Sequence, residues 1–238
     1  MAALQPMPAL TIAPEQLKQF GDAWLANNGS LGRTSPFSSS DLGRVFDETV
    51  GKALAVMLGG IPIDYRPSAT ALKPAHPDCV EVGPVRVIGG VRPQNFDVGY
   101  RPDGIRFAFD SKTLNDAKSV GKNWQNMVND LATEATTVHT RFPHAVVALL
   151  VIIPAPCISA ARLSALVQTL ERLTGRTNVS DPMHRAEAAA LVIWDPATGE
   201  VSPALPKPDS PLRLEAFSAQ VQAIYSSRYK GLPPHAGE

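Results

Sequence analysis

Residues 95–112 read NFDVGYRPDGIRFAFDSK, and this stretch predicts two strands joined by a tight turn. Asp103-Gly104 is typical of a two-residue hairpin turn of type I′, in which both central residues take a positive φ angle. With the turn placed there, Asp97 on the first strand lies directly opposite Asp110 on the second. A four-residue loop centred at the same place gives the same register.

Side chains along the two predicted strands alternate between two faces. One face collects large apolar residues and is expected to face a core: Phe96, Val98, Tyr100, Phe107 and Phe109. The other face collects Asp97, Gly99, Ala108, Asp110 and Lys112. The hairpin therefore predicts one buried face and one face that carries two acids and a lysine.

Two carboxylates at opposed positions are roughly 5 Å apart at Cβ and repel each other. A divalent cation between Asp97 and Asp110 would remove the repulsion. Mg²⁺ suits the position, because it takes oxygen ligands and usually keeps waters for a substrate phosphate. Lys112 points to the same side, where it could orient or deprotonate a water or neutralise charge on the phosphate.

The rest of the chain predicts a mixed central sheet flanked by helices, an α/β (α+β) fold. Helices are expected at 14–27, 41–58, 117–141, 159–174 and 212–229, and strands at 79–88, 96–101, 105–112, 145–153 and 188–194. The last two strands are apolar on both faces, which is typical of strands covered on both sides. We divide the chain into an N-terminal helix and connector (1–40), a core (41–200), and a linker, C-terminal helix and tail (201–238).

Composition limits the possible functions. The 238 residues are 44% hydrophobic, which is enough for one sizeable core, and the formal net charge is zero. A nucleic-acid surface would therefore need local clusters of positive charge. Cys79 and Cys157 show no zinc-ligand spacing, and the longest apolar run is too short to cross a bilayer. We expect a cytoplasmic protein with no membrane partner and, lacking phosphate-loop motifs, no nucleotide cofactor.

Asp97 on one strand and Asp110-Ser111-Lys112 on the next resemble the PD-(D/E)XK nuclease superfamily, which includes many type II restriction endonucleases. The segment order over about 41–154, a helix, three strands, a helix and a strand, also resembles the family core. The resemblance implies a restriction-endonuclease-like fold in which both acids bind Mg²⁺, the lysine assists attack by water and a phosphodiester is hydrolysed. Phe96 stands where the family motif has proline, and Pro102-Asp103 is assigned to the turn.

The resemblance also implies residues outside the hairpin. Many family members supply a further acid from the helix before the sheet, which here points to Glu48. Its neighbour Asp47 could do so instead, although we expect Asp47 at the surface. On the helix at 117–141, Lys122 and Gln125 are the predicted DNA contacts.

Several arginines bracket the predicted site and could meet phosphates of the DNA backbone: Arg66, Arg86, Arg92, Arg101 and Arg106. Arg101 and Arg106 are the preferred pair, because they oppose each other near the hairpin tip on the acid-bearing face. His139 and His144 lie at a predicted helix end, where we expect a capping or surface role.

These observations predict a Mg²⁺-dependent endodeoxyribonuclease of the sequence-specific restriction type that acts on double-stranded DNA. Cleavage of both strands needs two active sites, so a homodimer is expected. One alternative is a catalytically inactive DNA-binding or assembly protein of the same fold. Another is a metal-dependent nuclease that acts on RNA, on a small phosphodiester or in repair.

Overall fold

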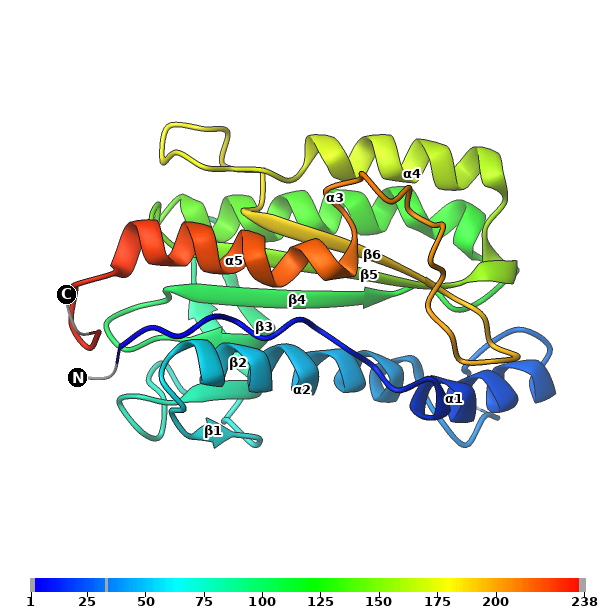
Figure 1. The fold of residues 1–238 in the computed structure, drawn as a ribbon, viewed down its shortest axis with the longest axis horizontal. Coiled ribbons are helices and arrows are strands. Elements are labelled where there is room, and N and C mark those ends of the chain that lie inside the picture. Colours follow the sequence, from blue (N-terminus) through cyan, green and yellow to red (C-terminus); the bar gives the residue numbers. More distant parts are fainter. Residues whose placement is uncertain (1–2, 33, 236–238) are drawn as a thin grey trace.

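The computed structural model describes residues 3–32 and 34–235. In this part of the chain, six strands form one sheet in sequence order: β1 (Ile63–Asp64), β2 (Val80–Ile88), β3 (Pro93–Tyr100), β4 (Phe107–Thr113), β5 (Val146–Pro154) and β6 (Ala188–Trp194). The β2–β3 and β3–β4 pairs are antiparallel, and the other neighbouring pairs are parallel. The predicted mixed sheet of an α/β fold is confirmed (Figure 1).

Helices cover both faces of the sheet: α1 (Pro14–Ala26), α2 (Ser39–Met57), α3 (Val120–His139), α4 (Ala160–Arg172) and α5 (Leu214–Tyr229), with a 3₁₀ turn η1 (Ala155–Cys157). One face packs against α2 and α5, as shown by the rings of Phe109 and Phe217, whose centroids are 6.1 Å apart. The opposite face carries α3 and α4 (Figure 1). The order α2-β2-β3-β4-α3-β5 agrees with the predicted core order.

Helix α2 begins two residues before the expected start at residue 41, because Ser38 caps it. The Ser38 hydroxyl accepts from the Asp41 amide at 3.2 Å, and the Asp41 carboxylate accepts from the Ser38 amide at 2.8 Å. This reciprocal pair satisfies two of the amides left open at a helix start. It fixes where α2 begins over the sheet.

The register predicted for the β3–β4 hairpin is confirmed, with Val98 opposite Phe109 and Tyr100 opposite Phe107. The predicted type I′ turn is wrong. The strands are joined by the longer loop 101–106, closed by the Arg106 amide donating to the Tyr100 carbonyl at 2.9 Å. Gly104 has φ of 116°, but Asp103 does not take the positive φ that a type I′ turn needs. The loop stays centred on the same two residues, so the register is unchanged.

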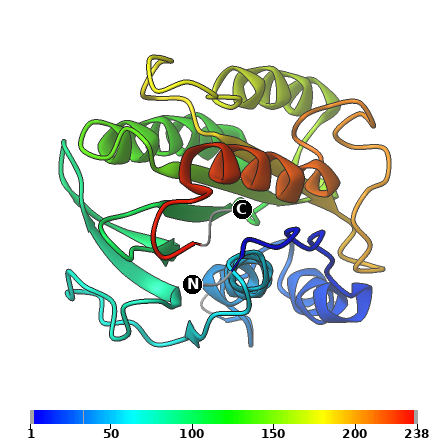
Figure 2. The same cartoon turned by 60° about the vertical axis from the view of Figure 1, so that its left-hand side comes forward.

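Residues from both ends of the chain join the same hydrophobic core as the sheet, among them Trp24 and Phe217. Figure 2 shows α1 beside α2, and α5 lying over the sheet. After α5, His235 is buried and its Nε2 lies 2.8 Å from the Tyr225 hydroxyl. Among the described residues, no helix combines the length and apolar character needed to cross a membrane.

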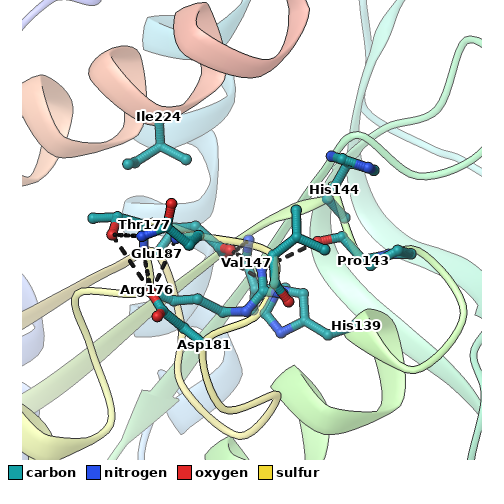
Figure 3. Close-up of polar contacts among 12 residues, drawn as sticks. His139, Pro143, His144, Val147, Arg176, Thr177, Asp181, Glu187 and Ile224 are labelled. Carbon is teal, nitrogen blue, oxygen red and sulfur yellow. Dashed lines mark hydrogen bonds and ion pairs between the residues drawn. The ribbon is translucent and has the colours of Figure 1, made fainter.

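A buried ion network ties together the starts of β5 and β6. The Glu187 carboxylate accepts from Arg176 Nη1 at 2.7 Å, Arg228 Nη1 at 2.8 Å and the Val147 amide at 2.7 Å. His139 Nε2 lies 3.1 Å from the same carboxylate (Figure 3). The expected surface role of His139 is therefore wrong: this histidine is 1% exposed and belongs to the network.

Candidate active site

Strands β3 and β4 separate beyond the Val98–Phe109 pair, although both continue as strands. The Asp97 carboxylate lies in the gap between them. Its Oδ2 accepts a hydrogen bond from the Ser111 amide at 2.9 Å and lies 3.2 Å from the Ser111 hydroxyl. Because the side chain replaces a backbone ladder bond, Asp97 is held at the point where the sheet opens.

Helix α2 contributes Asp47 to the same gap. The Ser111 hydroxyl donates to Asp47 Oδ1 at 2.8 Å, so one serine connects the carboxylates of Asp47 and Asp97. Burial and the nearby charge of Asp97 raise the pKa of Asp47 to about 8. An acid with this pKa is destabilised as a carboxylate in the metal-free protein.

The expectation that Glu48 supplies the further acid is corrected. Glu48 faces away from the gap and pairs with Arg44 at 3.2 Å and Lys52 at 3.7 Å on the outer side of α2. Successive helix residues are rotated by about 100°, so Asp47 and Glu48 cannot both face the sheet. Asp47 takes the inward position, and the prediction that it lies on the surface is wrong.

Asp110 and Lys112 project to the other face of the sheet, toward α3. Lys112 Nζ forms an ion pair with the Asp110 carboxylate and lies 2.9 Å from Glu134 Oε1. Burial, Glu134 and Asp97 together raise the pKa of Asp110 well above its usual value. Burial acts to lower the pKa of Lys112, but both acids act against it and raise that pKa, so the side chain is a stable ammonium group.

Sequence reasoning missed Glu134. Its position was visible in the pattern of α3, because Leu131 and Val138 lie on the same face of the helix and are fully buried. An acid in such an apolar stripe must be paired or protonated. In the structure Glu134 is 4% exposed and is paired with Lys112.

The prediction that Asp97, Asp110 and Lys112 project from one face is corrected: Asp97 lies with Asp47 of α2, whereas Asp110 and Lys112 lie with Glu134 of α3. A hollow of about 290 Å³ is lined by residues of α2, β3 and β4, including Asp47, Asp97, Ser111 and Lys112. The Lys112 side chain is 28% exposed, whereas that of Asp110 is 7% exposed and lies behind it. Asp47 and Asp97 line the hollow, whereas Asp110 does not.

Arg101 and Arg106 do not belong to this opening, and their predicted role in DNA binding is corrected. Arg101 forms a buried, two-pronged ion pair with Glu81, at 2.6 and 2.7 Å. Arg106 pairs with Asp103 and donates to the Pro233 carbonyl at 2.6 Å. The longer loop turns both guanidinium groups inward, where a DNA phosphate has no access.

Lys122 and Gln125 are exposed on α3. Gln125 precedes Glu134 by nine residues, which places it roughly 180° away around the helix. Neither side chain faces the acids of the hairpin, and their contact with DNA stays a prediction.

The potential metal ligands of the site are carboxylate oxygens, which are the ligands that Mg²⁺ prefers. All its acidic groups offer carboxylate oxygens, and the pKa values of Asp47 and Asp110 are raised for want of neutralising charge. Over residues 3–32 and 34–235, no three His, Cys, Asp or Glu side chains are grouped to hold a metal ion. Mg²⁺ commonly binds one or two carboxylates and completes its shell with water and substrate phosphate. The donor set therefore fits Mg²⁺, with Asp97 as the accessible ligand and Asp47 and Asp110 beside it.

The chain was compared with protein-family models, curated proteins and solved structures, and none of the three comparisons gave a match.

Proposed function

We propose that the protein is a metal-dependent nuclease of the PD-(D/E)XK type that hydrolyses phosphodiester bonds in DNA. The observation that carries the proposal is that Asp97 lies near the Asp110–Lys112 ion pair, at the point where β3 and β4 separate. Such a divergence of two strands exposes side chains from both edges to one ligand.

The charge of the site supports a cationic ligand with a phosphate. Two carboxylates, Asp110 and Glu134, share the Lys112 ammonium group, and two more, Asp47 and Asp97, lie nearby and are joined through Ser111. Burial, and after it the charge of neighbouring carboxylates, raises the pKa of both Asp47 and Asp110. A divalent cation would neutralise the carboxylates, and its remaining positions would accept water and phosphate oxygens.

In the proposed reaction a water oxygen attacks phosphorus and releases a proton to solvent, one phosphorus–oxygen ester bond breaks, and the departing oxygen takes a proton from solvent. Bound Mg²⁺ would supply an activated water and polarise the phosphoryl oxygens. Asp97 and Asp110 would hold the cation. The Asp47–Ser111–Asp97 hydrogen bonds keep the Asp97 carboxylate oriented toward the hollow.

Lys112 would act as a fixed positive charge rather than as a base. Its raised pKa keeps the ammonium protonated at neutral pH. Glu134 and Asp110 anchor the ammonium group, and the Lys112 side chain is 28% exposed. A positive charge there would stabilise the negative charge that grows on the phosphate during attack.

The finer proposal is a sequence-specific enzyme of the type II restriction kind that cuts double-stranded DNA as a homodimer in the cytoplasm. The stand-alone size of the chain and the need for two active sites per duplex support it. Both cysteines are unpaired, which suits a reducing compartment.

The test incubates plasmid DNA with the protein and Mg²⁺, with and without a chelator, beside Asp110→Asn. We expect metal-dependent cutting that falls by at least about 1,000-fold in the variant. The matched control is Glu48→Gln, which removes an exposed acid of the same helix that supplies Asp47 and should cut normally. Discrete fragments would support sequence specificity. DNA binding by the wild-type protein without cutting under any divalent metal would refute the nuclease and favour an inactive binding protein.

A further inference from the structure

A second hollow, of about 460 Å³, lies at the hairpin end of the sheet. It is bounded by the 101–106 loop, the end of β2, the proline-rich segment 72–77 and the residues that follow α3. Within the described ranges it shares no lining residue with the hollows beside Asp97. We call it the loop cleft.

The loop cleft carries an excess of positive charge. Lys73, Arg86 and Arg141 line it, and none of them forms an ion pair with another residue in the described parts of the chain. Asp103, the acid in its lining, is already neutralised by Arg106. Three uncompensated cations around one opening favour an anionic ligand.

Two of these cations are held in place. Arg141 Nη1 donates to the Ile88 carbonyl at 3.0 Å, and its guanidinium carbon lies 5.4 Å from the centre of the Phe142 ring. Arg86 Nη1 lies 3.4 Å from Asn95 Oδ1. Each of these contacts uses one nitrogen and leaves other donors, and the planar guanidinium fork matches the oxygens of a phosphate.

The walls between the cations are apolar and come from Val87, Ile105 and Phe142, among others. An inorganic anion would make no contact with these apolar side chains. A phosphate ester that carries a flat, weakly polar body would use both the cations and the walls. The volume of the cleft lies in the range of small-ligand sites.

We propose that the loop cleft binds a nucleotide, with the phosphate held by Arg86 and Arg141 and the base against the apolar wall beside Phe142. Asn95, the partner of Arg86, also lines a hollow beside Asp97, so Arg86 lies between the two openings. A DNA strand that crosses the acidic site would continue past Asn95 into the cleft. The anion follows from the charge of the cleft, and the choice of a nucleotide rests on the proposed function.

The experiment titrates the full-length protein with deoxyadenosine monophosphate by calorimetry at low salt without metal. Arg86→Gln and Arg141→Gln should each weaken binding about tenfold, because each loses a charge-assisted hydrogen bond. Lys73→Gln should weaken it about threefold. Lys73 is exposed, so this variant reports on the cleft even if an arginine variant unfolds. The matched control is Arg172→Gln, an exposed arginine at the end of α4 outside the cleft.

Competing ligands separate a free nucleotide from a nucleotide in a strand. A short oligodeoxyadenylate that displaces the mononucleotide supports a strand, and one that does not supports a free nucleotide; both agree with the proposal. Equal affinity for inorganic phosphate or for unphosphorylated deoxyadenosine would overturn it. So would mononucleotide binding that all three cleft variants leave unchanged, or no binding by the wild-type protein.

The two proposals fail separately. Asp110→Asn should keep mononucleotide binding while losing DNA cleavage. A wild-type protein that binds the nucleotide in the cleft and never cuts DNA would refute the nuclease alone. One that cuts DNA while its cleft variants bind the nucleotide normally would refute the cleft alone.

Discussion

Buried acids lie at two places in the sheet, and the two places differ in how many positive groups contact each acid. At the start of β5 and β6, one acid, Glu187, receives two arginines, a histidine and a backbone amide (Figure 3). Around the second half of β4, Asp110 and Glu134 share the ammonium group of Lys112, and Asp47 and Asp97 are joined only through Ser111. Glu187 therefore has more than one positively charged partner, whereas the acids around β4 outnumber the positive charges that contact them.

The pKa shifts follow this difference. Burial acts to raise the pKa of Glu187, but the hydrogen bond from His139 and the charges around it lower the pKa below its usual value. At Asp47 and Asp110 burial and like charges act in the same direction, and both pKa values rise. A buried carboxylate with positively charged partners is stable as an anion. Buried carboxylates without enough such partners are destabilised as anions, and a bound cation would stabilise them.

The largest effect is expected for substitution of Lys112, the cation that pairs with Asp110 and Glu134. Lys112→Gln should lower the rate of DNA cleavage by about 1,000-fold, because the positive charge beside the phosphate is lost. The measurement is the initial rate on plasmid DNA at saturating Mg²⁺. Lys52→Gln, which removes an exposed lysine of α2, should cut normally. A fall of less than tenfold for Lys112→Gln would remove this residue from the catalytic group.

The Glu187 network should respond in stability instead. Glu187→Gln leaves two buried guanidinium groups without a counter-charge and should lower the free energy of unfolding at pH 7 by about 3 kcal/mol. Urea denaturation measures it. Because the folded-state pKa of Glu187 lies below its usual value near 4.5, its stabilisation is present above that pH and is lost as pH falls further. The variant should therefore lose less stability in acid than the wild type, and equal acid sensitivity would contradict this role.

Glu134 should act through Lys112 as a positioning residue. Glu134→Gln keeps the size of the side chain but removes one of the two acids that anchor the ammonium group. We expect kcat to fall about tenfold with KM unchanged, because a lost positioning contact weakens transition-state stabilisation more than binding. Asp130→Asn, at an exposed position of the same helix, is the control. A change in KM alone, or a loss of folded protein that accounts for the whole effect, would rule out positioning.

The smallest effect concerns the metal-free protein. Asp47→Asn removes one of the repelling acids and should raise the free energy of unfolding at pH 8 by about 0.5–1 kcal/mol. Since the pKa of Asp47 rises from 3.8 to about 8 on folding, the folded state holds the extra proton, and wild-type stability should fall as pH rises between these values. Thermal melting across this pH range, with Glu48→Gln as control, measures it. A destabilised Asp47→Asn would show that the carboxylate is structural.

The hairpin was predictable because its information is local. Alternating apolar residues set the faces, and the turn residues set the register, so the Val98–Phe109 pairing follows from one short stretch. The turn type was less secure, because the loop is shaped by Arg106, which pairs with Asp103 and reaches Pro233. Contacts with such distant residues leave no local pattern.

The choice between Asp47 and Glu48 could have been made from the sequence. The apolar stripe of α2 is centred near Phe46 and Val50. Asp47 lies about 100° from Phe46, at the flank of the stripe, whereas Glu48 lies about 200° away, on the outer side. The resemblance to a nuclease family called for an acid on this helix, and the helical phase decides which acid it is.

The sequence by itself determined the five longer strands, the helices and the hairpin register, because these depend on periodicity over a few residues. Only the tertiary structure decided which charges are neutralised. Glu81 takes up Arg101, and Glu134 joins Lys112, through contacts between elements that are far apart in the chain. Burial and neutralisation are properties of the packed assembly, so the same residue type can be a buried support in one place and a reactive group in another.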